Sequence, residues 1–248
     1  MDTSETLGLA HFFAQTDTVG KALFATLAAM SIASWYFIIV KSLQALIARR
    51  RSTRFLENFW NSASLAAVER QLGKRHPNEP FSHLAYHALL SCRHHAKHGA
   101  DRLNEAGSAA EFLTRSIRRV IDEETAGLEW GLSVLASVAS TAPFIGLFGT
   151  VWGVYHALIN IGMSGQGTLD KIAGPVGEAL IMTGAGLAVA IPSVLAYNAF
   201  ARSNRLVLAK LDAFAHDVFA VLSTGAHFAG PPAGVATGPA SEAFAGGA

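Results

Sequence analysis

Two threonines and one glutamate lie inside long uncharged stretches of the sequence. Glu178 is the single charged residue between Ile172 and Ala201, and Thr183 follows it in the same stretch. Thr150 lies in another stretch, Trp130–Leu169, which contains no Asp, Glu, Lys or Arg. A hydroxyl group can accept and donate hydrogen bonds, and a carboxylate can bind a proton. These side chains are therefore candidates for proton transfer or for contact with a polar partner.

Three stretches are long and apolar enough to position such groups inside a membrane. We expect transmembrane helices at residues 22–40, within 129–161 and at 174–201. A bilayer core of about 30 Å requires roughly 20 apolar residues in a helix. The composition agrees, because 51% of the residues are hydrophobic and 15% are charged, whereas soluble domains contain about 25% charged residues. The sequence predicts an all-α membrane protein.

The basic residues indicate how the three predicted spans are oriented. Of the 19 Lys and Arg residues, all except Lys21 and Lys171 lie either between residues 41 and 128 or after the third span. Cytoplasmic segments of membrane proteins carry an excess of Lys and Arg. We therefore expect a periplasmic N-terminus and a cytoplasmic C-terminus. The residues before the first span are mainly acidic, which favours an uncleaved helix over a signal peptide.

These features divide the sequence into eight expected segments. They are a periplasmic segment (1–21), the first transmembrane helix (22–40), a cytoplasmic helical domain (41–128), the second transmembrane helix with a cytoplasmic extension (129–161), a periplasmic turn (162–173), the third transmembrane helix (174–201), a cytoplasmic C-terminal helix (202–224) and a disordered tail (225–248). Residues 112–140 change from charged to apolar without a Gly-Pro break. The second membrane helix is therefore expected to continue into the cytoplasm.

Small residues gather on one face of the second predicted span. At 100° per residue, the side that carries Thr150 also carries Gly146, Gly149, Gly153 and Ala157. Small residues on one face let a neighbouring membrane helix approach closely. Pro143 is expected to bend this helix. The face predicts a close helix–helix contact.

The third span has a comparable face, which carries Glu178, Thr183, Gly186 and Ser193. Thr150 and Thr183 both lie about 15 Å from the outer end of their helices. Their hydroxyls can line one pathway if the two faces turn toward each other, which a helical wheel does not determine. Glu178 has two interpretations: it reaches the headgroups or pairs with a basic group on a partner, or it lines an ion route or a partner-binding pore.

Other patterns favour no metal, cofactor or enzymatic chemistry. His83 and His87 have the i, i+4 spacing of a metal pair, with Cys92 nearby, but no recognisable motif positions a carboxylate beside them. A solvated cytoplasmic helix is the expected interpretation. The sequence contains no nucleophile elbow, HExxH motif or paired-carboxylate arrangement, so we expect no enzyme. A net charge of +1 argues against binding to nucleic acid.

Two linked motifs carry a resemblance to a known family. "APFIGLFGTVWG", followed by "AGPVGEALIMTGAGLAVAIPSVLAYN", resembles the ExbB/TolQ/MotA family of proton-driven motor subunits, and its ExbB branch most of all. The resemblance is strongest over residues 130–201 and extends in topology to about residue 224. It implies a pentameric homo-oligomeric ring in the bacterial inner membrane, around the single-span helices of an ExbD dimer. It further implies that the ring passes work to TonB, which energises uptake of iron-siderophores and vitamin B12 across the outer membrane.

The resemblance also implies roles for three residues. Thr150 in "GLFGTVWG" and Thr183 in "GEALIMT" match positions on the proton route, facing an aspartate of the ExbD helix. Glu178 matches a position that lines the pore or contacts the partner. The sequence departs from the family in the glycine-rich "MTGAG" and in His156, which we expect to be a packed or interfacial histidine.

Two alternatives to an ExbB-type role stay open at this point. A subunit of the TolQ branch, serving outer-membrane integrity and cell division, has the same chemistry and a different client. A passive membrane scaffold, whose Glu178 docks a partner, needs no proton route. The four-span plan of the MotA branch fits the short segment before the first span less well.

Overall fold

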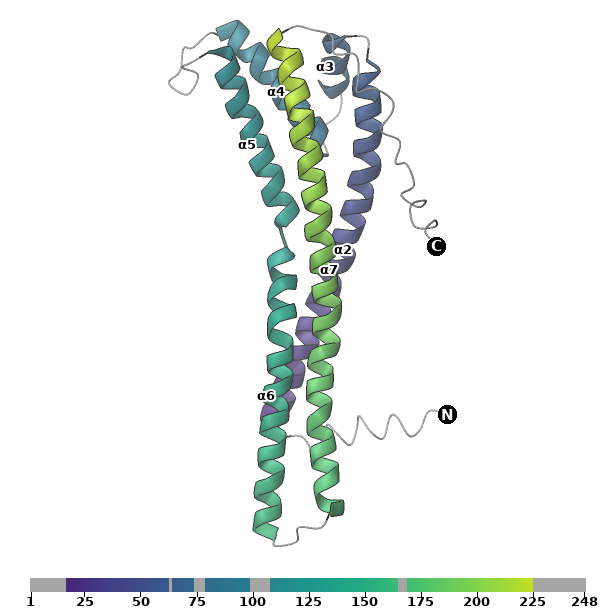
Figure 1. The fold of residues 1–248 in the computed structure, drawn as a ribbon, viewed down its shortest axis with the longest axis vertical. Coiled ribbons are helices and arrows are strands. Elements are labelled where there is room, and N and C mark those ends of the chain that lie inside the picture. Colours follow the sequence, from purple (N-terminus) through teal and green to yellow (C-terminus); the bar gives the residue numbers. More distant parts are fainter. Residues whose placement is uncertain (1–16, 63, 74–78, 99–107, 165–168, 225–248) are drawn as a thin grey trace, which may run out of the picture. The chain divides into compact units, whose positions relative to one another are not determined.

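A computed structural model describes residues 17–62, 64–73, 79–98, 108–164 and 169–224, in which every regular element is an α-helix. The helices are α2 (Thr18–Trp60), α3 (Leu65–Gly73), α4 (Pro80–His98), α5 (Ala109–Glu129), α6 (Leu132–Ser164) and α7 (Leu169–Thr224) (Figure 1). The all-α prediction is confirmed. Most of the predicted periplasmic segment, the centre of the periplasmic turn and the predicted tail lie outside the described residues.

Three helical stretches are long and apolar enough to cross a membrane. They are Thr18–Trp60, Ala109–Met163 and Ala179–Ser223, judged by length and composition. Each contains the greater part of one span expected from the sequence. The helices continue beyond the predicted spans, since α2 has 43 residues and α7 has 56, whereas about 20 residues cross the apolar core.

The contacts within the chain divide it into two compact units. The first unit contains the chain up to Ile47 together with Thr125–Val207. The second unit contains Ala48–Glu124 together with the chain from Leu208 onward. Helices α2, α5 and α7 each contribute to both units, and each unit is described separately below.

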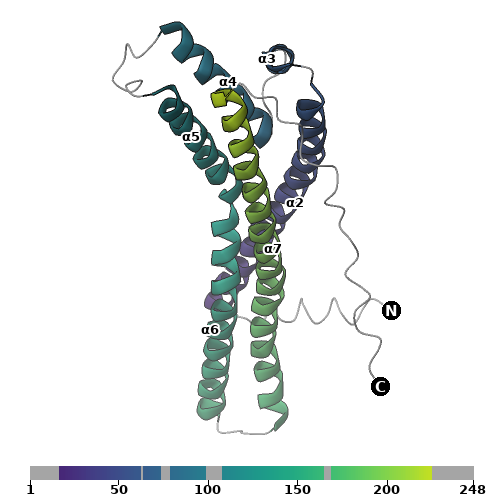
Figure 2. The same ribbon diagram turned by 45° about the horizontal axis from the view of Figure 1, so that its top comes forward.

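In the first unit, α6 and the first part of α7 lie side by side, which two views show (Figures 1 and 2). Leu27 of α2 joins them in a buried cluster with Val138 and Ala142 of α6 and Met182 and Ala190 of α7. The outward surface is also apolar. Exposed side chains on it include Ile32 (73% exposed), Phe144 (70%) and Leu195 (64%). Such a surface is typical of helices that face lipid or further helices.

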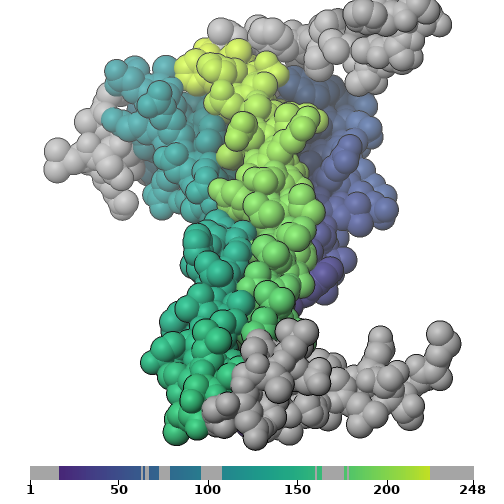
Figure 3. All heavy atoms as spheres, turned by 60° about the horizontal axis from the view of Figure 1, so that its bottom comes forward, coloured from purple at the N-terminus to yellow at the C-terminus, as the bar shows by residue number. Residues whose placement is uncertain are grey.

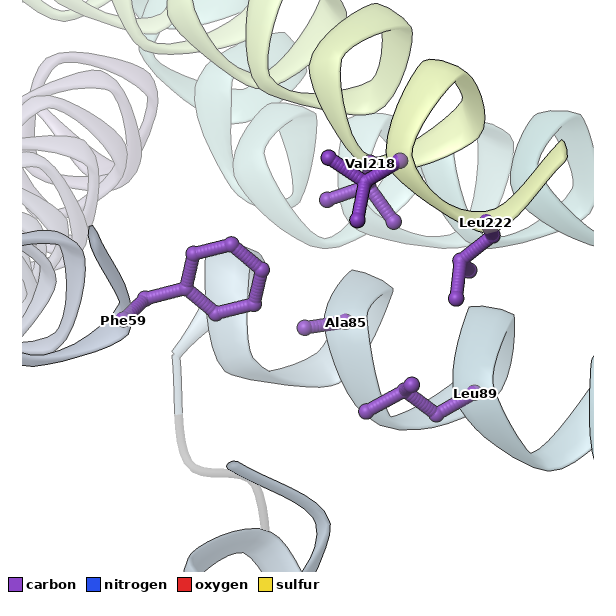
Figure 4. Close-up of a pocket in the computed structure, with 6 residues that line it drawn as sticks. Phe59, Ala85, Leu89, Val218 and Leu222 are labelled. Atoms are coloured by element: carbon purple, nitrogen blue, oxygen red, sulfur yellow. The ribbon is translucent and has the colours of Figure 1, made fainter. Parts of the chain in front are cut away.

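The second unit has a core built around Phe214 of α7. This ring makes edge contacts with Phe59 at 5.0 Å and Phe81 at 5.7 Å between centroids, and Leu84, Leu113 and Leu211 are fully buried in the same core. A shallow depression beside it is lined by Phe59, Ala85, Leu89, Val218, Val221 and Leu222 (Figure 4). Because all six side chains are apolar, the depression offers no side-chain group that can bind a polar ligand.

Helices α2, α4 and α5 begin at residues whose side chains satisfy free backbone amides. Asp17 accepts a hydrogen bond from the Gly20 amide (2.8 Å) at the start of α2. Ser108 and Glu111 form a reciprocal capping box at the start of α5, and Glu79 accepts two backbone hydrogen bonds at the start of α4. Such caps satisfy donors that have no partner within the first turn of a helix.

The structure shows a break within residues 112–140, where the sequence has no Gly-Pro signal. Helix α5 ends at Glu129 and α6 begins at Leu132. Between them Gly131 has φ = 79°, a left-handed conformation that glycine adopts without steric penalty. A Cβ at Gly131 would lie 2.6 Å from the Phe37 ring. A single glycine, held by tertiary contacts, is therefore enough to break the helix without a proline.

Candidate functional site

The hydroxyl groups of Thr150 and Thr183 form a hydrogen bond between α6 and α7. Thr150 Oγ1 also lies 3.1 Å from the Gly146 carbonyl oxygen of its own helix and 3.2 Å from the Ala179 carbonyl oxygen of α7. A hydroxyl carries one hydrogen, so Thr150 can donate to one of these carbonyls while it accepts from Thr183. The two faces that carry the threonines therefore turn toward each other. Both side chains are partly buried.

Glycines let the two backbones approach closely beside this pair. A Cβ at Gly146 would lie 2.6 Å from the Met182 carbonyl oxygen, and one at Gly186 would lie 2.7 Å from the Ala142 carbonyl oxygen. Cβ atoms essentially never make contacts shorter than 3.0 Å. Gly149 and Gly153 lie against α7 in the same way, the first against Met182 and the second against Ala179. Figure 3 shows atoms of α6 and α7 meeting along this part of the first unit.

The face of α7 that the sequence singled out is the face that packs inside the first unit. Met182, Gly186, Ala190 and Ser193 are buried. In contrast, a Cβ at Gly184 would meet nothing within 4 Å. The opposite sides of the two helices are therefore free to face lipid or another subunit.

The remaining candidate residues have different outcomes. Ala157 is buried, and Pro143 lies inside α6, which continues through it. The side chain of Glu178 lies outside the described ones, and the backbone of this residue belongs to α7. Its proposed pore-lining or partner-contacting role stays a prediction.

The two threonine hydroxyls can pass a proton along their hydrogen bond. They cannot themselves carry a charge at neutral pH, because aliphatic hydroxyls do not ionise there. Between residues 130 and 201 the sequence contains acidic side chains at Asp170 and Glu178 alone, both toward the turn between α6 and α7. Neither acid lies beside the threonines along the sequence of α6 or α7, and Asp17 of this unit is engaged by the Trp152 indole, two residues from Thr150. The site is suited to passing a proton to or from a partner carboxylate.

The structure also joins polar residues that the sequence patterns did not connect. Ser34 of α2 and Ser193 of α7 are both buried, and their hydroxyl oxygens lie 2.6 Å apart. Ser193 donates to the Val189 carbonyl at 2.7 Å, so Ser34 is the donor in the serine pair. The two residues are 159 positions apart. Because they lie in separate apolar stretches, no spacing rule could have paired them.

A second missed contact lies at the start of α2. The Trp152 indole of α6 donates to Asp17 at 2.7 Å, and the Trp152 and His156 rings lie 4.5 Å apart. Burial alone would raise the pKa of Asp17, but the hydrogen bonds from Trp152 and Gly20 and the nearby His156 hold that pKa below its usual value. His156 is partly buried, and its Nδ1 donates to the Trp152 carbonyl oxygen of its own helix at 3.2 Å.

The histidine-rich segment lies on α4 in the second unit. His83 Nδ1 is 2.6 Å from a Glu124 carboxylate oxygen, and the His83 and His87 rings lie 4.6 Å apart. Among the described residues, no three His, Cys, Asp or Glu side chains are arranged to hold a metal ion. Burial lowers the pKa of His87, and so does the neighbouring His83.

The described helices include three stretches that are long and apolar enough to cross a membrane. Comparison with known proteins defines the class. Residues 79–213 match the model of the MotA/TolQ/ExbB proton channel family. The chain is 43% identical over 202 residues to the biopolymer transport protein ExbB of Xanthomonas campestris. The aligned residues make up 81% of this chain and 80% of that protein. It is 41% identical over 213 residues to the ExbB of Neisseria meningitidis, covering 86% and 96% respectively.

A Tol-Pal system protein, TolQ of Pseudomonas aeruginosa, is 32% identical over 204 residues, which is 82% of this chain and 87% of that protein. The TolQ similarity is thus lower than the ExbB similarity. The chain belongs to the MotA/TolQ/ExbB proton channel family. It is an inner-membrane transport protein and not an enzyme, with a sequence nearer to the ExbB relatives than to TolQ.

Proposed function

We propose that this chain is the ring-forming subunit of an ExbB-type motor, which uses the proton motive force to energise TonB-dependent uptake across the outer membrane. Five copies surround the single-span helices of an ExbD-like dimer. The imported ligands are iron-siderophores and vitamin B12. The higher identity to ExbB proteins than to TolQ supports this client.

The observation that carries the proposal is the hydrogen bond between Thr150 and Thr183. Two hydroxyls are joined across a helix pair that glycines hold at close range. The uncharged part of the same helix pair supplies no carboxylate at that depth. An aspartate on the ExbD-like helix, opposite the threonines, then carries the proton, and the hydroxyl pair passes it on or stabilises its charged form. Moving one charge across 100 mV releases about 2.3 kcal/mol, which is enough to bias a movement of the ring relative to the ExbD-like helices.

The orientation follows from the distribution of basic residues. The N-terminus is periplasmic, and the second unit, with the end of α7, is cytoplasmic. Arg49, Arg50, Arg51 and Arg54 are exposed on α2 directly after its apolar part, which supports a cytoplasmic position for this end. Glu178 lies near the periplasmic turn and lines the pore or contacts the ExbD-like partner.

A complementation experiment tests the proton route. A strain that lacks the gene receives wild type, Thr183→Val, Thr183→Ser or Thr26→Val, and grows in iron-chelated medium with a siderophore. Valine keeps the shape of threonine without its hydroxyl, so Thr183→Val should abolish growth while the complex still assembles, and Thr183→Ser should retain it. Thr26 bonds only to the Ala22 carbonyl of its own helix among the contacts described, and Thr26→Val serves as the matched control. Normal growth with Thr183→Val would rule out the proposed route.

The same strains distinguish the client. Growth in bile salts at normal iron tests outer-membrane integrity. A defect confined to the iron-chelated medium supports the TonB client, whereas a defect confined to bile salts assigns the chain to the Tol system. A passive scaffold would keep both kinds of growth in every threonine variant.

A further inference from the structure

The break between α5 and α6 is held by side chains from two other helices of the first unit. Lys41 of α2 donates to the Leu128 carbonyl oxygen at 2.9 Å and to the Gly127 carbonyl oxygen at 3.3 Å. Asn204 of α7 donates to the same Leu128 carbonyl oxygen at 2.8 Å. A lysine and an asparagine 163 positions apart thus converge on the last turn of α5.

These contacts satisfy carbonyls that the helix itself leaves without donors. The last four carbonyls of a helix have no partner within it. In α5 the Ala126 carbonyl accepts from the Trp130 amide at 3.1 Å, and the Gly127 and Leu128 carbonyls accept from Lys41 and Asn204. A cation at this end also interacts favourably with the helix dipole.

The Lys41 ammonium group is enclosed at this position. Lys41 is only 7% exposed, and its nitrogen lies over the Trp130 ring, 5.8 Å from the ring centroid. Phe37, one turn earlier on α2, makes an edge contact with the same ring at 5.4 Å. Phe37 also fills the space beside Gly131, where a Cβ would lie 2.6 Å from it. If the break moved away from α2, the buried ammonium would lose the carbonyls that offset its desolvation.

We propose that Lys41 and Asn204 are positioning residues, which cap α5 from two sides and thereby fix the direction in which α6 leaves the break. The cap determines how α6 lies against α2 and α7 in the first unit, and through α6 it places Thr150 opposite Thr183. This role in placing Thr150 rests on the proposed proton route, whereas the cap itself does not.

Distance measurements across the break test the cap directly. In the complex carrying Cys92→Ser, spin labels at Ala126→Cys and Ser140→Cys lie on exposed positions of the first unit, on either side of Gly131. They are separated by about 20 Å along a helix axis. Lys41→Met and Asn204→Leu should broaden the distance distribution, and Lys41→Arg, which keeps a charged donor, should leave it narrow. Loss of one such hydrogen bond corresponds to about a tenfold rise in displaced conformations.

Matched controls carry the same substitutions at exposed positions of the same helices, Lys21→Met on α2 and Asn198→Leu on α7. Both controls should keep the narrow distribution. If folded Lys41→Met and Asn204→Leu complexes show distributions as narrow as the parent, the cap is refuted. Asn204→Leu leaves Lys41 in place, so it tests the cap even if Lys41→Met does not fold.

Siderophore uptake separates this inference from the proposed function. Lys41→Met should lower the uptake rate with unchanged assembly, and Lys41→Arg should restore it. Normal uptake in Thr183→Val, together with a broadened Lys41→Met distribution, would refute the proton route and support the cap. Normal uptake in Lys41→Met together with failed uptake in Thr183→Val would refute the positioning role and support the route.

Discussion

Replacing Gly146 by alanine tests the close approach of α6 and α7. The new Cβ would lie 2.6 Å from the Met182 carbonyl oxygen, whereas ordinary contacts begin at 3.4 Å, so the backbones must separate by about 0.8 Å. Met182 contributes a backbone atom at this contact, and it cannot rotate away as a flexible side chain can. Overpacking of this kind costs about 1–3 kcal/mol.

The substitution also has a favourable effect that must be separated from the clash. Alanine stabilises a helix by about 1 kcal/mol relative to glycine, so the net loss for Gly146→Ala is about 0–2 kcal/mol. Gly184→Ala provides the matched control, because a Cβ there meets nothing within 4 Å. The helix-propensity effect is the same in both variants. Subtracting one from the other therefore isolates the clash, and we expect Gly146→Ala to be less stable than Gly184→Ala by about 1–3 kcal/mol.

The assay is equilibrium unfolding in mixed micelles with increasing SDS, followed by tryptophan fluorescence. Gly186→Ala, whose Cβ would lie 2.7 Å from the Ala142 carbonyl oxygen, should behave like Gly146→Ala. Gly149→Ala should cost less, because its Cβ would meet the flexible Met182 side chain. Equal stabilities for Gly146→Ala and Gly184→Ala would refute the close approach on which the Thr150–Thr183 hydrogen bond depends.

Three further predictions concern other contacts. Ser193→Ala should destabilise the protein more than Ser34→Ala. The first variant leaves the buried Ser34 hydroxyl without its acceptor, whereas in the second Ser193 still donates to the Val189 carbonyl of its own helix. A double-mutant cycle by SDS unfolding should give a coupling energy of about 0.6–1.7 kcal/mol. Phe214→Ala should lower the stability of the second unit by about 3–5 kcal/mol, measured by thermal unfolding, because the ring lies at the centre of its core. Burial and the neighbouring His83 lower the pKa of His87, so the unfolded chain binds more protons just below pH ~6.5, and stability should rise with pH through that window; His87→Gln should flatten the rise.

Controls and contrary outcomes accompany these three predictions. A coupling near zero would mean that Ser34 and Ser193 do not interact. Leu206→Ala, at a 58% exposed position of α7, should have a small effect beside Phe214→Ala, and equal effects would argue against the core described here. An unchanged pH profile in His87→Gln would show that another group titrates in that range.

The sequence by itself determined the class of fold and the family. Uncharged stretches of about 20 residues or more can cross a bilayer as helices, because a helix satisfies the hydrogen bonds of its own backbone amides and carbonyls. The 3.6-residue period then assigned Thr150 and Gly146 to one face of α6, and Thr183 to a face of α7. The motifs around these residues indicated the family that the comparisons established. These inferences depend on the spacing of residues within a single helix, and that spacing can be read directly from the sequence.

Only the tertiary structure decided how the helices meet. A helical wheel fixes the faces of a helix but not its rotation against a neighbour, and the packing of Gly146 against Gly186 sets that rotation here. The Ser34–Ser193 hydrogen bond depends on the contact of α2 with α7, far apart in the chain. No Gly-Pro motif marks the break at Gly131 in the sequence. The break is held instead by Phe37 and Lys41, which both lie on α2. Interactions between distant segments have no local pattern, so they follow from packing alone.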